Sequence, residues 1–155
     1  MAVRAAPTPA RRPGLSYRRL VVPLTAEVES ETAMALAAEL ATDYGSAITA
    51  VLVIEVPPNL PLDCHMLDEE RDARSVLEEA RALAERRGVR VHTRVVRARE
   101  AGEAIVEETH AAEADVVVLR APRVGDRRRK VFGKTVDYVL KHAPCRVLVA
   151  APPAP

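Results

Sequence analysis

Five short apolar runs alternate along the chain with stretches in which apolar residues recur at helical spacing. The runs are rich in Val, Ile and Leu and are bounded by Gly, Pro or charged residues. They cover residues 18–24, 46–56, 89–96, 115–120 and 145–150. Runs of this length and composition predict buried β-strands, and their aliphatic character is typical of a parallel sheet that is covered on both faces.

Two helices are predicted in the first half of the chain. The first has an apolar face that consists of Ala33, Ala37, Leu40, Ala41 and Tyr44. Ser30 is its expected N-cap and Gly45 its expected end. The second has the clearest apolar stripe in the chain, which consists of Ala73, Val76, Leu77, Ala80, Leu83 and Ala84. Gly88 is expected to close this second helix.

Two further helices are predicted, over about residues 101–113 and 134–142. The last of them is expected to turn Val136, Val139 and Leu140 inward. Strands and helices therefore alternate strictly along the chain. With right-handed crossovers, this order predicts an α/β fold of the Rossmann-like type, in which a doubly wound, open five-stranded parallel sheet carries helices on both faces.

Ligands of such sheets lie beyond the carboxyl ends of the strands, at the point where the winding reverses. In this chain that edge is expected to gather residues 23–26, the segment after Val53 and the loop over residues 120–132. The sequence Gly133-Lys134-Thr135 follows this loop and has the form of the end of a P-loop. A P-loop needs a further glycine five positions earlier, where this chain has Arg128, so the P-loop is excluded.

The start of the last helix still favours an anion. Free backbone N–H groups and the positive end of the helix dipole are expected to point into the loop that precedes it. Lys134, Thr135 and the basic run that begins at Arg127 would add positive charge and a hydroxyl group. Alternatively, Gly133 only permits a turn and the basic run is a solvated loop. The residues alone leave both interpretations open.

Composition and charge narrow the function classes. The chain has 155 residues, of which 48% are hydrophobic and only 3% aromatic, so one domain with an aliphatic core is expected. A formal net charge of +1 argues against recruitment to nucleic acid. Cys64 and Cys145 form no CxxC pair, and no apolar run is long enough to span a bilayer. We expect a cytoplasmic domain over residues 17–151 with tails at 1–16 and 152–155.

Three features of the chain resemble the universal stress protein family. They are the first strand LVVPL at residues 20–24, the alternating layout, and the closing sequence GKTVDYVLKHAPCRVLVA at residues 133–150. The resemblance covers about residues 17–151 and implies a domain of the adenine nucleotide alpha hydrolase-like kind, usually a homodimer. Many members bind ATP through a G-x-x-G sequence, nine residues, and a further Gly with Ser or Thr, together with an Asp after the first strand.

This sequence departs from that signature. Arg120 and Arg123 stand where the first two glycines are expected, and Lys134 stands where Ser or Thr should follow Gly133. Thr25 occupies the position of the Asp. An arginine brings a Cβ and a long side chain into a loop that glycines leave open for phosphate, although its charge could also pair with phosphate directly.

Two interpretations of the site follow from the resemblance and these departures. The first is a regulatory or binding domain, stress-related or associated with a transporter, with a degenerate nucleotide site. It is similar to stress-protein domains that are fused to amino-acid permeases and lack the glycine signature. The second is a working switch that binds ATP or another adenine nucleotide with Mg²⁺ through Arg and Lys. The candidate nucleotide- or anion-binding residues are Thr25, Val53, Arg120, Arg123, Gly125, Arg127, Gly133, Lys134 and Thr135.

Catalysis and metal binding find little support in the sequence. It has no G-x-S-x-G motif, and no pair of histidines has the spacing of metal ligands. The acidic run over residues 68–72 is mixed with Arg, as on a solvated helix face. We therefore expect no catalytic residue, no metal site and at most weak nucleotide hydrolysis.

The last predicted strand indicates an oligomer. Val147, Leu148 and Val149 make both of its faces apolar, and its outer edge would stay uncovered in a monomer. Pairing with the same strand of a second copy would cover that edge, so we expect a homodimer. A transporter is the kind of further protein partner that the resemblance suggests.

Overall fold

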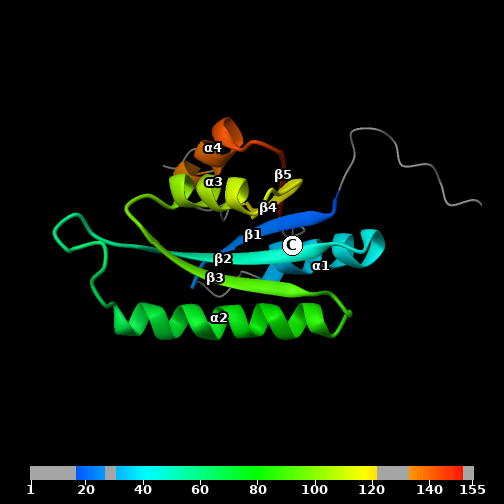
Figure 1. Ribbon diagram of the computed structural model, residues 1–155, viewed down its shortest axis with the longest axis horizontal. Coiled ribbons are helices and arrows are strands. Elements are labelled where there is room, and N and C mark those ends of the chain that lie inside the picture. Colours follow the sequence, from blue (N-terminus) through cyan, green and yellow to red (C-terminus); the bar gives the residue numbers. More distant parts are fainter. Residues whose placement is uncertain (1–16, 27–30, 122–132, 152–155) are drawn as a thin grey trace, which may run out of the picture.

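The computed structural model describes residues 17–26, 31–121 and 133–151, and over these ranges strands and helices alternate as predicted (Figure 1). The strands are β1 (Arg19–Leu24), β2 (Ala47–Glu55), β3 (Val91–Ala98), β4 (Val116–Arg120) and β5 (Arg146–Ala150). The helices are α1 (Glu31–Tyr44), α2 (Leu67–Glu85), α3 (Ala101–Ala111) and α4 (Gly133–His142).

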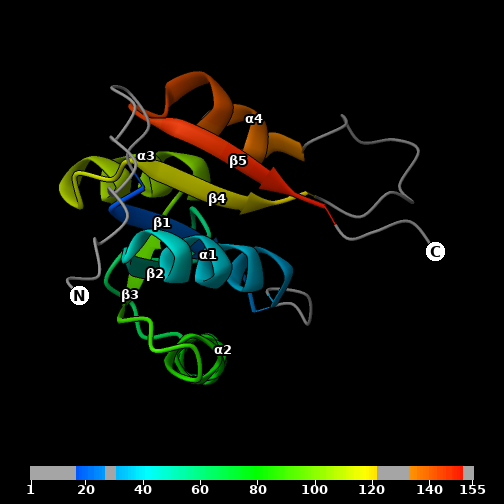
Figure 2. The same ribbon diagram turned by 90° about the vertical axis from the view of Figure 1, so that its right-hand side faces the viewer.

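All strands form one parallel sheet in the order β3-β2-β1-β4-β5. The chain therefore starts in the middle of the sheet, winds outward to β3, and then crosses to β4 on the other side of β1. Helices α1 and α2 cover one face of the sheet, and α3 and α4 cover the other (Figures 1 and 2). This arrangement confirms the doubly wound α/β fold.

The central strand β1 is buried on both faces. Leu20 and Val22 pack in the layer under α1 and α2, while Val21 packs in the layer under α3 and α4. None of the three is more than 1% exposed. The sheet therefore divides the core into two aliphatic layers, and the carboxyl ends of β1 and of the strands beside it border the candidate site.

Two side chains that were predicted to face inward are exposed instead. Leu140 of α4 is 44% exposed and Tyr44 of α1 is 51% exposed, so the prediction was wrong for both. The buried stripe of α4 is limited to Val136 and Val139, because this helix packs mainly against α3 rather than across the sheet. Tyr44 ends α1, and its ring packs against that of Tyr17 in a tilted arrangement, with the centroids 4.8 Å apart.

The ends of the elements are close to the predicted ones. Gly45 and Gly88 follow α1 and α2 with φ of 64° and 70°, as expected of residues that close a helix. Strand β3 begins at Val91, two residues later than predicted, because Val89 still belongs to the turn that ends α2. Ser30, the expected N-cap of the first helix, lies outside the described residues.

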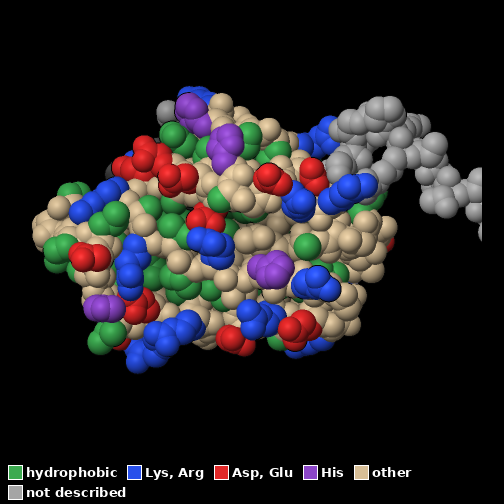
Figure 3. Space-filling model, in the orientation of Figure 1, with side chains coloured by type: hydrophobic (Ala, Val, Ile, Leu, Met, Phe, Trp, Pro, Cys, Tyr) green, Lys and Arg blue, Asp and Glu red, His purple; other side chains and the backbone are tan. Residues whose placement is uncertain are grey.

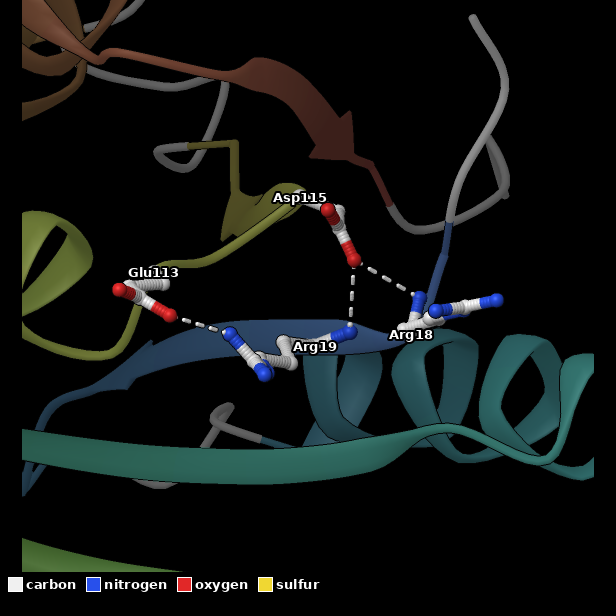
Figure 4. A network of polar contacts seen from close by, with 4 residues as sticks. All are labelled: Arg18, Arg19, Glu113 and Asp115. Carbon is white, nitrogen blue, oxygen red and sulfur yellow. Dashed lines mark hydrogen bonds and ion pairs between the residues drawn. The ribbon is translucent and has the colours of Figure 1, made fainter. Parts of the chain in front are cut away.

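A polar network joins the amino ends of β1 and β4 (Figure 4). Oδ2 of Asp115 accepts hydrogen bonds from the backbone N–H groups of Arg18 at 2.9 Å and Arg19 at 3.0 Å. The Arg19 guanidinium also donates to Glu113 at 2.7 Å. Because Asp115 directly precedes β4, these bonds hold β1 and β4 beside each other, and the opposite ends of the same two strands border the candidate site.

The surface carries charges of both signs. On the face shown in Figure 3, acidic and basic side chains are interspersed rather than gathered by sign, in keeping with the nearly balanced charge of the chain. Among the helices that the structure describes, none is long and apolar enough to cross a membrane.

Candidate functional site at the carboxyl edge of the sheet

The winding of the sheet reverses between β1 and β4, which are neighbours in the sheet although two other strands separate them in the chain. The exposed Thr25 follows the last residue of β1, Leu24, and β4 ends at Arg120. Val53 of β2 lies level with Thr25, because Leu24 pairs with Leu52. The structure therefore brings Thr25, Val53 and Arg120 to one edge of the sheet, where the sequence analysis expected them.

Helix α4 begins at the same edge with the other candidate residues. Its first residue, Gly133, has φ of 71°, and it is followed by the exposed Lys134 and the half-buried Thr135. The N–H groups of the first turn of a helix have no partners within the helix, and the positive end of the dipole lies there. The position therefore suits an anion such as phosphate. That these residues bind a ligand stays a prediction.

Lys134 is already paired with a carboxylate. Its Nζ lies 2.7 Å from Oε2 of Glu100, the residue that directly precedes α3. The Lys134 side chain is 82% exposed and that of Glu100 is 47% exposed. The hydrogen bond and the negative charge of Glu100 raise the pKa of Lys134, and the charges of Glu55 and Glu103 raise it further. Lys134 is therefore a protonated cation beside an acidic cluster.

The acidic cluster consists of Glu55, Glu100 and Glu103, and it is built by the start of α3. Glu55 is the last residue of β2, and its Oε1 accepts the N–H of Ala101 at 3.3 Å. Glu103 lies in the first turn of α3, where a negative charge is favoured by the helix dipole. None of the three residues was predicted from the sequence. An acidic side chain at or shortly after the carboxyl end of a predicted strand is a signal that could have found Glu55 and Glu100, whereas Glu103 stands inside a predicted helix and carries no such signal.

The structure describes only one of the remaining candidates in the loop before α4. Arg123, Gly125 and Arg127 lie outside the described residues. Arg120 is half-buried, and its Nε donates to the backbone oxygen of Ala121 at 3.3 Å. The sequence left open whether the cationic side chains hold an anion or belong to a solvated loop. For Lys134 the structure shows an ion pair with a carboxylate of the same chain, that of Glu100.

Other acidic residues of the chain also lie in ion pairs. Within the run over residues 68–72, Arg71 donates to Asp68 at 2.7 Å, while Glu70 reaches across to Arg97 of β3. The hydrogen bond from Arg97 holds the pKa of Glu70 below its ordinary value. The pair of Arg71 with Asp68 lies on the exposed surface of α2, whereas the pair of Glu70 with Arg97 joins α2 to β3.

We looked for a metal site or a reactive thiol elsewhere in the described part of the chain. In residues 17–26, 31–121 and 133–151, no group of three or more His, Cys, Asp or Glu side chains could hold a metal ion. Cys64 and Cys145 are both free thiols. Burial raises the pKa of Cys145, which disfavours its thiolate form.

Comparisons with known proteins agree with this architecture. Residues 16–151 match a family model described as the universal stress protein family. A curated universal stress protein of Methanocaldococcus jannaschii is 28% identical over 145 residues, which cover 88% of this chain and 84% of that protein.

Two solved structures show the same fold. A universal stress protein from Archaeoglobus fulgidus superposes with a TM-score of 0.73 at 18% identity, covering 87% of this chain and 99% of that one. A universal stress protein in complex with cAMP superposes with a TM-score of 0.72 at 17% identity, covering 88% and 98% of the two chains.

Proposed function

This chain belongs to the universal stress protein family, and from that premise we propose that it is a regulatory domain with a weakened adenine-nucleotide site and no turnover of its own. The observation that carries the proposal is the start of α4, which lies at the carboxyl edge of the sheet with Lys134 paired to Glu100. The start of α4 suits a phosphate, but Lys134 must break its ion pair with Glu100 before it can contact that phosphate. Binding of a nucleotide at such a site can act as a signal even when the nucleotide is not hydrolysed.

An adenine nucleotide is the ligand class that fits best. One structure with the same fold was solved in complex with cAMP. In this chain Thr25 and Val53 lie at the end where a base and sugar would meet the sheet, and Gly133 and Lys134 lie where a phosphate would meet α4. Thr25 offers a hydroxyl group in place of the Asp of the family signature, so a weaker hold on the sugar is expected.

Isothermal titration calorimetry tests this proposal. The protein is titrated with ATP, ADP, AMP and cAMP, with Mg²⁺ present, and with adenosine and GTP as comparisons. We expect saturable binding of at least one adenine nucleotide, with a dissociation constant above about 1 μM. Lys134→Met is expected to weaken the binding of the nucleotide but not of adenosine.

The matched control is Lys141→Met, which removes a lysine from the other end of the same helix. It is expected to leave every dissociation constant unchanged. A folded protein that gives no heat with any adenine nucleotide would contradict the proposal and would favour a domain that acts through a protein partner alone.

The physiological setting belongs to the same proposal. In its departure from the glycine signature the sequence resembles stress-protein domains that are fused to amino-acid permeases, and this resemblance supports a role in a stress response or beside a transporter. Such a domain would work in the cytoplasm, where adenine nucleotides are abundant. Co-purification of a cation-coupled transporter with the tagged protein, lost on nucleotide addition, would support the transporter role.

We also propose that the protein is a homodimer through β5. In the described residues β5 pairs with β4 on one side only, and Val147, Leu148 and Val149 are half-buried within the single chain. The unpaired backbone N–H and C=O groups at such an edge can form hydrogen bonds with a strand of a second copy. Light scattering after size exclusion is expected to give twice the chain mass of 16.9 kDa at micromolar protein concentration. A monomer mass throughout a dilution series would refute the dimer.

A further inference from the structure

The Lys134–Glu100 pair joins the starts of two helices that pack against each other. Helices α3 and α4 cover the same face of the sheet, and their amino ends both lie at its carboxyl edge. Lys134 is the second residue of α4, and Glu100 directly precedes α3. The contact of 2.7 Å between Nζ and Oε2 therefore spans the two helix starts, beside the position proposed for the phosphate.

The Glu100 carboxylate makes no bond to its own helix. Its backbone is extended, with φ of −130° and ψ of 122°, which is ordinary for an N-cap residue, yet its side chain makes no capping hydrogen bond. Glu55 accepts the N–H of Ala101 instead. Since Glu55 accepts a hydrogen bond from the first residue of α3, the carboxylate of Glu100 is available to Lys134.

We propose that Glu100 is a built-in competitor of the nucleotide phosphate: it holds Lys134 in the ligand-free protein, and a bound phosphate takes Lys134 from it. This inference rests on the proposed nucleotide site. Glu100 thereby sets the affinity for ligands that carry phosphate, while ligands without phosphate are indifferent to it. Glu55 and Glu103 strengthen the hold on Lys134 by their charge, as the raised pKa of the lysine indicates.

The exchange is physically easy. Both side chains are well exposed, so water screens their attraction and such pairs are weak. A phosphate at the start of α4 offers Lys134 a stronger partner, because it carries more charge and is itself held by backbone N–H groups. Glu100 therefore lowers the affinity for phosphate without abolishing it.

A double-mutant cycle tests this competition by calorimetry with AMP and with adenosine. The four proteins are the wild type, Glu100→Gln, Lys134→Met and the variant with both changes. Glu100→Gln is expected to tighten AMP binding by about two- to fivefold and to leave adenosine binding unchanged. In the Lys134→Met background the gain from Glu100→Gln is expected to disappear. Glu107→Gln is the control, because it removes the same charge about two turns further along α3.

Each outcome of the cycle decides the inference. If Glu100→Gln tightens AMP binding equally in the wild type and in the Lys134→Met background, Glu100 merely repels the phosphate. If it tightens adenosine binding as much as AMP binding, the change reshapes the pocket. Either result overturns the competition. Unchanged AMP binding by Glu100→Gln overturns it while the nucleotide site stands. If no variant binds any adenine nucleotide although circular dichroism shows each one folded, the proposed function itself has failed.

Discussion

The Leu20→Ala variant is expected to lose about 2–5 kcal/mol of its free energy of unfolding. Leu20 lies in the middle strand of the sheet and is 1% exposed, between α1, α2 and the neighbouring strands. Its neighbours Ile48 of β2 and Val116 of β4 are themselves fully buried, so the surrounding structure has little freedom to collapse into the space that alanine leaves. The loss therefore includes both the transfer of the side chain and an unfilled cavity.

Urea unfolding followed by circular dichroism measures this loss, as a lower midpoint at an unchanged slope. Leu20→Val is the graded variant and is expected to lose about 0.5–1.5 kcal/mol, by analogy with Ile→Val changes. Leu67→Ala is the matched control, because Leu67 is 71% exposed at the start of α2, and its effect is expected to stay within about 0.5 kcal/mol. An equal effect of Leu20→Ala and Leu67→Ala would contradict the burial of β1.

The second large effect is expected at Gly102, in the first turn of α3. A Cβ built on Gly102 would lie 2.9 Å from the Cβ of Tyr138 in α4, closer than side chains pack. Helix propensity favours alanine over glycine by about 1 kcal/mol. We nevertheless expect Gly102→Ala to lower the free energy of unfolding, by about 1–3 kcal/mol, because the two helices must move apart. A lower free energy of unfolding in Gly102→Ala would show that the packing of α3 on α4 outweighs helix propensity, and a higher one would show the reverse.

The same urea experiment measures this change, and Tyr138→Ala gives a test of its cause. In the Tyr138→Ala background the cost of Gly102→Ala is expected to fall, since two of the three close contacts of the new Cβ are with ring atoms of Tyr138. Glu107→Ala, on an exposed position of the same helix, serves as the control. A stabilising effect of Gly102→Ala would show that α3 and α4 do not approach as closely as described.

Gly102 also connects stability to the candidate site. It stands two residues after Glu100, and Tyr138 lies one turn beyond Lys134, so the close approach of α3 and α4 also brings the two charged side chains together. Any change that separates the helices should weaken the hold of Glu100 on Lys134. Gly102→Ala is therefore expected to reduce the effect of Glu100→Gln on AMP binding.

Most of the fold could be predicted from local pattern alone. The alternation of aliphatic runs with helical stripes implied the order of elements, and the glycines at 45 and 88 marked two helix ends. Where that prediction was wrong, the cause lies in tertiary packing. Leu140 is at helical spacing from Val136, yet it is exposed because α4 packs mainly against α3 and buries only a narrow stripe. Periodicity describes which residues share a face, but not how wide a face the neighbours cover.

The site was predictable only in outline. The rule that ligands meet the carboxyl ends of parallel strands led to Thr25, Val53, Arg120 and the start of the last helix. Arg123, Gly125 and Arg127 stay predictions, because they lie outside the described residues. Glu100 was missed, since it lies 34 residues before its partner and no sequence motif joins the two.

The amino-acid sequence by itself determined the order of strands and helices, the aliphatic core, and the departures from the glycine signature of the family. These are properties of period, composition and residue identity, which can be read one segment at a time. The tertiary structure alone decided that Lys134 meets Glu100 and that Glu55, rather than Glu100, bonds the start of α3. Ion pairs and hydrogen bonds act over about 3 Å, and only the packing of one element on another brings distant residues to that distance.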